Sequence, residues 1–201
     1  MSLVPGTDRQ SPPPPGVKLT YDDFLLFPDD GLRHELIDGE HYVTPSPSLR
    51  HQRISGNIYT AIRTYLREHP IGEIFYAPLD VVLSNVDVVE PDLLYVARER
   101  AGEVLTSMHV RGVPNLVVEI GSKSTSRRDD TIKRRLYERS GVDEYWIVDP
   151  ATDTIRVFRH ADDRFAPAIE LRRDAGHTLT TPLLPGFTIE LTAIFPPDTS
   201  A

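Results

Sequence analysis

The chain contains no cysteine, which excludes disulfide bonds and thiolate metal ligands. It has no apolar run approaching the ~20 residues that a membrane-spanning helix needs. Its first residues also lack the basic and then apolar pattern of a secretory signal. These absences predict a protein of the reducing cytoplasm with no membrane attachment.

A surplus of positive charge is also lacking. The 22 Lys and Arg residues face 30 Asp and Glu residues, which gives a formal net charge of −8. This balance argues against a protein that binds nucleic acid with its whole surface, but it allows a local groove in which a bound cation contacts a phosphate group. One basic cluster stands out, although a solvated helix face is its commoner explanation; it comprises Lys123, Arg127, Arg128, Lys133, Arg134 and Arg135.

The 201 residues show no internal repeat and no break in composition that would require two domains. Residues 1–17 include four consecutive prolines, 12–15, and few apolar side chains. Such a segment favours a disordered or polyproline leader. We therefore predict one folded domain over residues 18–195.

Residues 114–150 organise the predicted fold. The pattern predicts a strand over 116–121, a helix over about 128–140 and a second strand over 144–149. This is the strand, crossover helix and parallel strand of an α/β layer. Glu119 lies in the middle of the first strand, whose apolar run is typical of a strand covered on both faces, so its charge needs a partner. A metal ion is one such partner.

The crossover helix holds a second unexpected charge. Its predicted buried stripe consists of Ile132, Leu136 and Tyr137. Lys133 falls on the same stripe, which directs it toward the strand that carries Glu119. An ordinary surface ion pair between Asp129 and Lys133, four residues apart, explains the helix pattern equally well.

Three further polar residues lie near predicted core elements. Glu35 is in the segment HELIDGEHYVTP, which predicts two short strands, and a solvated position is the commoner one for such a glutamate. Asp92 begins a strand and shares a face with Leu94 and Val96, which places it at the mouth of the core. His51, near the start of a helix predicted over 48–68, is a secondary candidate, because a lone histidine there is more often packed or capping.

Convergent carboxylates are the ligands that Mg²⁺ prefers, and Mg²⁺ also binds phosphate oxygens. A nearby lysine can orient the attacking water and offset charge that develops on the phosphate. Glu35, Asp92, Glu119 and Lys133 together therefore favour phosphodiester hydrolysis.

At these residues the chain resembles the Uma-two family of restriction-endonuclease-like proteins, in the PD-(D/E)XK nuclease superfamily. The resemblance covers roughly residues 18–160 and depends on HELIDGE, the region of His51, PDLLYV, LVVEIGSKSTSRRDD, Lys133, Tyr137 and GVDEYWIVDP. The ordered set is specific, whereas a Pro-Asp with a distant acid would be weak alone.

The resemblance implies an α/β restriction-endonuclease-like core, with a mixed central sheet flanked by helices and additional β-hairpins. It implies an Mg²⁺ site, with Mn²⁺ as the alternative ion, formed by Glu35, Asp92, Glu119 and the carbonyl of Ile120. It adds Asp80 as a secondary member. The superfamily motif expects lysine where this chain has Gly121, and in this family the role is expected to lie with Lys133. Lys123 is the rival, although its loop position favours solvent or phosphate contact.

We therefore predict a Mg²⁺-dependent DNA endonuclease. A non-catalytic module that keeps the fold and binds nucleic acid or protein is the alternative, favoured by the acidic balance and the lysine missing at 121. A purely structural ion-pair network is a third explanation. The hairpins predicted near 153–171 offer an edge for a homodimer, which suits nucleases that cut both strands.

Overall fold

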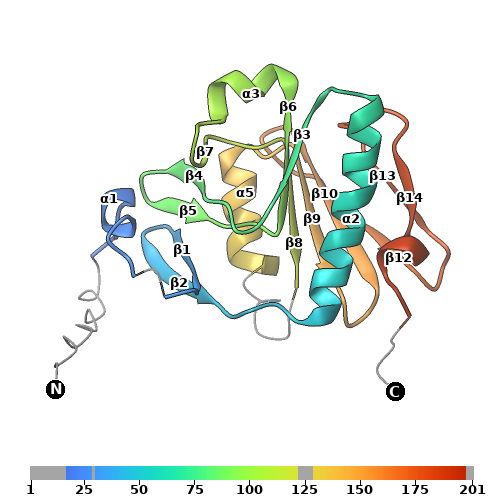
Figure 1. Ribbon diagram of the computed structural model, residues 1–201, viewed down its shortest axis with the longest axis horizontal. Coiled ribbons are helices and arrows are strands. Elements are labelled where there is room, and N and C mark those ends of the chain that lie inside the picture. Colours follow the sequence, from blue (N-terminus) through green and yellow to red (C-terminus); the bar gives the residue numbers. More distant parts are fainter. Residues whose placement is uncertain (1–16, 29, 122–128, 198–201) are drawn as a thin grey trace, which may run out of the picture.

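The computed structural model describes residues 17–28, 30–121 and 129–197 (Figure 1). Its helical elements are α1 (Tyr21–Phe24), α2 (Leu49–Glu68), α3 (Arg98–Val104), the π-helical turn η1 (Asp129–Lys133), α5 (Arg134–Ser140) and α6 (Leu191–Ile194). Its first strands are β1 (Arg33–Ile37), β2 (Glu40–Thr44), β3 (Gly72–Tyr76), β4 (Val81–Ser84), β5 (Asp87–Val89), β6 (Leu93–Ala97) and β7 (Val110–Arg111). The later strands are β8 (Leu116–Ile120), β9 (Glu144–Asp149), β10 (Thr154–Ala161), β11 (Arg164–Phe165), β12 (Ile169–Arg172), β13 (Thr178–Thr180) and β14 (Thr188–Glu190).

The described strands form a central mixed sheet in the order β11-β10-β9-β8-β6-β3, with β12 added to β10. β8 and β9 run parallel and are joined through η1 and α5, as the pattern of residues 114–150 predicts. β6 pairs with β8 in the antiparallel sense. The predicted α/β class, with a mixed sheet, flanking helices and extra hairpins, is confirmed.

The two faces of this sheet are covered by different elements, because successive side chains of each strand point to opposite faces. On one face lies α2, whose buried apolar side chains are Ile54, Ile58, Ile62 and Leu66. On the other face lie α5 and a smaller sheet in the order β2-β1-β5-β4-β7 (Figure 1). β1 therefore faces α5 across the region where β8 carries Glu119.

The start of α2 is fixed by a side-chain cap. The hydroxyl of Ser48 accepts a hydrogen bond from the backbone N–H of His51 at 3.2 Å. Such a cap typically contributes about 1 kcal/mol. It also sets the position of the His51 ring, which is buried.

The crossover helix differs from its prediction. It begins with the π-helical turn η1 rather than with regular α-helix, and the wider turn rotates the preceding side chains. Ile132, predicted to be buried, is 37% exposed. Lys133 is 2% exposed, and Leu136 and Tyr137 are fully buried, so the rest of the predicted stripe is confirmed.

A smaller difference concerns the hairpins predicted near 153–171. Their first strand is β10, whereas the return strand is divided into β11 and β12. Thr20 caps α1, with the reciprocal contact to Asp23 of a capping box. Within the described part of the chain, no helix is both long and apolar enough to span a membrane. The proline-rich leader, apart from residue 17, lies outside the described residues.

Candidate active site

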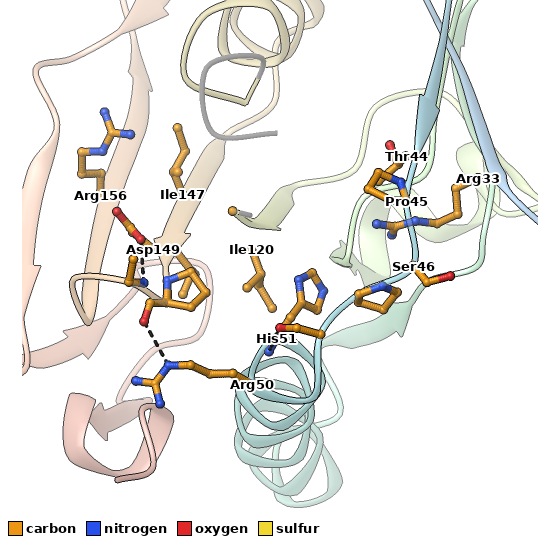
Figure 2. Close-up of a pocket in the computed structure, with 16 residues that line it drawn as sticks. Arg33, Thr44, Pro45, Ser46, Arg50, His51, Ile120, Ile147, Asp149 and Arg156 are labelled. Atoms are coloured by element: carbon orange, nitrogen blue, oxygen red, sulfur yellow. Dashed lines mark hydrogen bonds between the residues drawn. The ribbon is translucent and has the colours of Figure 1, made fainter. Parts of the chain in front are cut away.

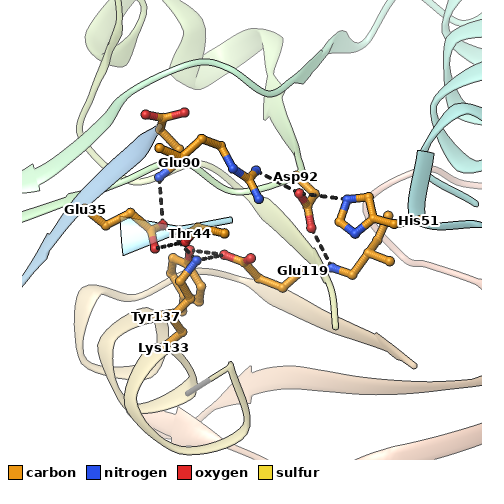
Figure 3. Close-up of polar contacts among 10 residues, drawn as sticks. Glu35, Thr44, His51, Glu90, Asp92, Glu119, Lys133 and Tyr137 are labelled. Carbon is orange, nitrogen blue, oxygen red and sulfur yellow. Dashed lines mark hydrogen bonds and ion pairs between the residues drawn. The ribbon is translucent and has the colours of Figure 1, made fainter. Parts of the chain in front are cut away.

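Lys133 lies between two glutamates at the junction of the two sheets. Its Nζ is 2.8 Å from Oε1 of Glu35 on β1 and 2.8 Å from Oε1 of Glu119 on β8 (Figure 3). Glu35 is 1% exposed and Glu119 is 5% exposed. The expectation that Glu35 is a solvated strand residue is therefore wrong, because η1 and α5 cover its side of β1.

The same two carboxylates accept further hydrogen bonds. The Tyr137 hydroxyl donates to Oε1 of Glu119 at 2.7 Å, and the backbone N–H of Glu90 donates to Oε1 of Glu35 at 3.1 Å. Burial, followed by the charge of Glu119, raises the pKa of Tyr137 well above its ordinary value. Tyr137 therefore stays protonated and remains a donor to Glu119.

Asp92, the residue just before β6, lies opposite Glu119 of β8. Leu93 pairs with Val118 in the antiparallel register of β6 and β8. Asp92, one residue before Leu93, therefore lies opposite Glu119, one residue after Val118. Side chains directly opposite each other in such a pair point to the same face, with Cβ atoms about 5 Å apart. The sheet thus brings two acids that are distant in sequence to one place.

Three groups hold the Asp92 carboxylate, which is 5% exposed. Oδ1 is 3.0 Å from the Arg33 guanidinium and 3.1 Å from Nε2 of His51, and Oδ2 accepts from the backbone N–H of Ile120 at 2.8 Å (Figure 3). Burial alone would raise the pKa of Asp92, but His51, Arg33 and the Ile120 N–H together hold it below its ordinary value. Burial would likewise lower the pKa of Arg33, yet the charge of Asp92 raises it.

The secondary candidates are placed differently. His51 contacts Asp92 directly. Asp80 is half-buried, and burial raises the pKa of its carboxyl, while its backbone carbonyl accepts from Val110 N–H. Lys123 lies outside the described residues.

Sequence reasoning missed Arg33 and Glu90 as members of this site. Alternation along a strand was the available signal, because Arg33 is two residues before Glu35 and Glu90 is two residues before Asp92. Burial, and secondarily the charge of Asp80, raises the pKa of Glu90 to about 7. Its Oε2 is buried and has no hydrogen-bond partner within the described residues.

A cavity of about 530 Å³ adjoins the Asp92 end of this cluster. Figure 2 shows Arg33 on one side of it, Arg156 on the opposite side, and His51 and Ile120 between them. Arg156 is paired with Asp130 at 2.6 Å, and Arg50 is held by the carbonyl of Pro150 at 3.0 Å. The cavity therefore presents guanidinium groups next to an acid, an arrangement suited to an anionic ligand that meets a cation.

The oxygen atoms at this site are of the ligand type that a hard divalent cation prefers. The carboxylates of Asp92 and Glu119 and the neighbouring carbonyl of Ile120 supply only oxygen, which Mg²⁺ prefers. Lys133 is the counter-ion of Glu35 and Glu119, and Arg33 is the counter-ion of Asp92. Without His51, these five side chains carry a net charge of −1. Among residues 17–28, 30–121 and 129–197, no three His, Cys, Asp or Glu side chains are arranged as a metal-ligand group. A cation at Asp92 would therefore compete with Arg33.

The mixed sheet, with acids paired across β6 and β8 and a buried lysine on the crossover helix, defines a restriction-endonuclease-like protein. The model of the Uma2 family, described as "Putative restriction endonuclease", matches residues 21–193. The chain therefore belongs to the Uma2 family.

A solved structure supports the same fold. A protein of Anabaena variabilis ATCC 29413, titled a "putative nuclease belonging to DUF820", superimposes with a TM-score of 0.75 at 19% sequence identity. The similarity covers 88% of this chain and 97% of that one. The search of curated proteins found no match.

Proposed function

We propose that this protein is a Mg²⁺-dependent DNA endonuclease, with Mn²⁺ as an alternative ion, in which Asp92, Glu119 and the Ile120 carbonyl hold the metal. The observation that carries the proposal is the antiparallel register that sets Asp92 opposite Glu119, beside the buried ammonium of Lys133. The family description supports a nuclease role. The cavity lined by Arg33 and Arg156 supports an anionic substrate such as a phosphodiester.

The protein's own residues have distinct roles in this proposal. His51 and the Ile120 N–H orient the Asp92 carboxylate and keep it ionised. Lys133 is the counter-ion of Glu35 and Glu119, and its ammonium can offset negative charge on the phosphate and orient the attacking water. Arg33 can move from Asp92 to a phosphate oxygen when a cation takes its place. The chemistry that Mg²⁺ supplies when bound is Lewis-acid polarisation of phosphate oxygens.

Nicking of supercoiled plasmid DNA tests the proposal. We expect the wild-type protein to relax the plasmid with Mg²⁺ and to stop on addition of EDTA. Asp92→Asn and Lys133→Met should each slow nicking by about 10²-fold or more, the typical cost of removing one electrostatic group from an active site. Asp22→Asn, which neutralises an exposed acid on α1, is the matched control and should nick at the wild-type rate.

Fluorescence of Trp146, the one tryptophan of the chain, verifies that each variant is folded. Wild-type protein that nicks no faster than folded Asp92→Asn would contradict the proposal.

A non-catalytic binding function is the second candidate, and the ion pairs of Lys133 support it. Lys133 bridges Glu35 and Glu119 directly at 2.8 Å, which is also the geometry of a structural ion-pair network. A member that keeps the fold and binds nucleic acid or protein without cleaving it would keep this network. Plasmid binding without nicking in Mg²⁺ and Mn²⁺ would favour this function.

The proposal also includes a cytoplasmic location and a homodimeric state. A chain without cysteine suits the reducing cytoplasm. Cutting both strands of a duplex would be served by a homodimer, and the region of β10 to β12 is the edge that we propose for pairing. We propose that residues 18–195 form the single nuclease domain.

A further inference from the structure

Helix α2 carries a charge opposite in sign to that of the whole chain. Its 20 residues contain four arginines and a single acid, Glu68 at the last position, whereas the formal charge of the chain is −8. Arginines on an exposed helix are often only a solvated face. Three features distinguish α2 from such a face: the line on which its arginines lie, the partners of those arginines, and a glycine between them.

The exposed residues of α2 form one stripe along the helix. They recur at every third or fourth position, which is the period of one face of an α-helix, and they include Gln52, Arg53, Gly56, Thr60, Arg63 and Arg67. With a rise of 1.5 Å per residue, the first arginine of the stripe is about 21 Å from the last. This is the length of about six base pairs of duplex DNA.

Two of these arginines have no counter-ion among the described residues. Arg63 and Arg67 lie one helical turn apart on the exposed side, and neither makes an ion pair within residues 17–28, 30–121 and 129–197. Arg50, at the start of the same helix, is instead paired with Asp153. Guanidinium groups that repeat along one line without acidic partners are suited to the phosphates of a nucleic-acid backbone.

Gly56 lies in the middle of the stripe, where the helix itself gains nothing from glycine. Glycine is among the poorest helix formers, because it loses the most backbone freedom on folding. A Cβ atom at position 56 would meet no atom of the described chain within 4 Å, so packing inside the protein does not require glycine there. Close approach of a ligand to the helix is the other common reason for a glycine.

The stripe begins beside the proposed metal site. Gln52 and Gly56 line a second cavity, of about 670 Å³, whose wall also includes Asp92. Figure 2 shows Arg50 and His51, at the start of α2, beside the first cavity. A duplex that has one phosphate at Asp92 can therefore continue along α2.

We propose that α2 is the duplex-binding surface of this protein, with the sugar–phosphate backbone of DNA close to Gly56 and its phosphates at Arg63 and Arg67. The inference rests on the proposed function, because the metal site determines which phosphate is cleaved. It specifies the substrate as double-stranded DNA with about six base pairs on one side of that phosphate.

Binding without metal tests the inference separately from cleavage. The probe is a fluorescein-labelled duplex of about 20 base pairs, measured by anisotropy in EDTA between about 50 and 200 mM NaCl. We expect Arg63→Gln and Arg67→Gln each to weaken binding by about fivefold and to reduce the slope of log K against log salt by about 1. Arg135→Gln, the same change at an exposed position of α5, is the control and should bind like wild type.

Gly56→Gln separates DNA binding from the stability of the fold. Glutamine is a better helix former than glycine, so the thermal unfolding midpoint should stay at or above the wild-type value. Binding should nevertheless weaken by about fivefold or more, because the new side chain holds the DNA backbone away from the helix. Gly102 on α3 is also exposed and has no described atom within 4 Å of its Cβ position, so Gly102→Gln is the matched control and should keep wild-type binding.

The outcomes separate this inference from the nuclease proposal. Weaker binding by the three α2 variants of a protein that never nicks plasmid would support the α2 surface and remove the catalytic role. Plasmid nicking by a wild-type protein whose α2 variants bind the duplex as tightly as it does would overturn the α2 surface alone. Equal weakening by Arg135→Gln, or no binding of the duplex by the wild-type protein, would also overturn it.

Discussion

Substitution of Lys133 by methionine removes one buried cation from between two buried acids. The apolar stem of lysine is largely preserved in methionine, so little packing is lost. Lys133 makes ion pairs at 2.8 Å with Glu35 and with Glu119, and all three side chains are almost inaccessible to solvent. Breaking a buried pair by removing one partner typically costs about 3–5 kcal/mol, because the remaining charge is uncompensated. We expect Lys133→Met to lower the free energy of unfolding at pH 8 by that amount.

Urea unfolding followed by the fluorescence of Trp146 measures this loss. With a denaturant slope of about 2 kcal/mol/M, the unfolding midpoint should fall by roughly 2 M. At pH 5 protons can neutralise the uncompensated carboxylates, so the loss should be smaller there. Arg135→Met, at an exposed position of the same helix, is the matched control and should change stability by less than about 0.5 kcal/mol.

A double variant separates the lost ion pairs from any other effect. Glu35→Gln with Lys133→Met leaves one fewer uncompensated charge, so it should recover about 1 kcal/mol or more relative to Lys133→Met alone. A loss below about 1 kcal/mol for Lys133→Met, or an equal loss at pH 5 and pH 8, would show that Lys133 does not stabilise the fold by neutralising the two buried glutamates.

Two further predictions concern the neighbouring groups. Glu90 has a pKa of about 7 in the folded protein and an ordinary value of 4.5, so the unfolded chain loses this proton first and wild-type stability falls as pH rises between these values. Glu90→Gln should therefore gain stability over wild type through that window and none below pH 4.5 in thermal melts; a constant difference from pH 4 to pH 8 would contradict this. Tyr137→Phe deletes a buried donor to Glu119 and should cost about 1.5–3 kcal/mol in urea unfolding, and a variant as stable as wild type would count against that hydrogen bond.

The fold could be predicted from the sequence because the elements of its central unit follow one another along the chain. The apolar run around Glu119, the crossover helix and the following strand are consecutive, and parallel pairing of β8 with β9 follows from that order. The burial of Lys133 followed from the helical period even though its turn is π-helical. Ile132 was assigned wrongly for the same reason, since a regular period cannot show a wider turn.

The site was only partly accessible, because its contacts join elements from different parts of the chain. Glu35 belongs to a short hairpin, and nothing in that hairpin shows that η1 and α5 cover it. The partners of Asp92 come from β1, α2 and β8, so only the three-dimensional arrangement shows that Arg33 and His51 hold it. The contacts of Lys133 with Glu35 and Glu119 likewise come from tertiary packing, because β1 and β8 bring the two glutamates to the crossover helix. The side chain of Asp129, the predicted surface partner, lies outside the described part of the protein.

In the proposed nuclease, Asp92 and Glu119 bind one divalent cation. Anomalous diffraction from crystals soaked in MnCl₂ tests it most directly. We predict an anomalous peak within coordination distance of both carboxylates, with the guanidinium of Arg33 displaced from Asp92. Absence of a peak between the two acids, with Arg33 still bound to Asp92, would contradict cation binding at this pair.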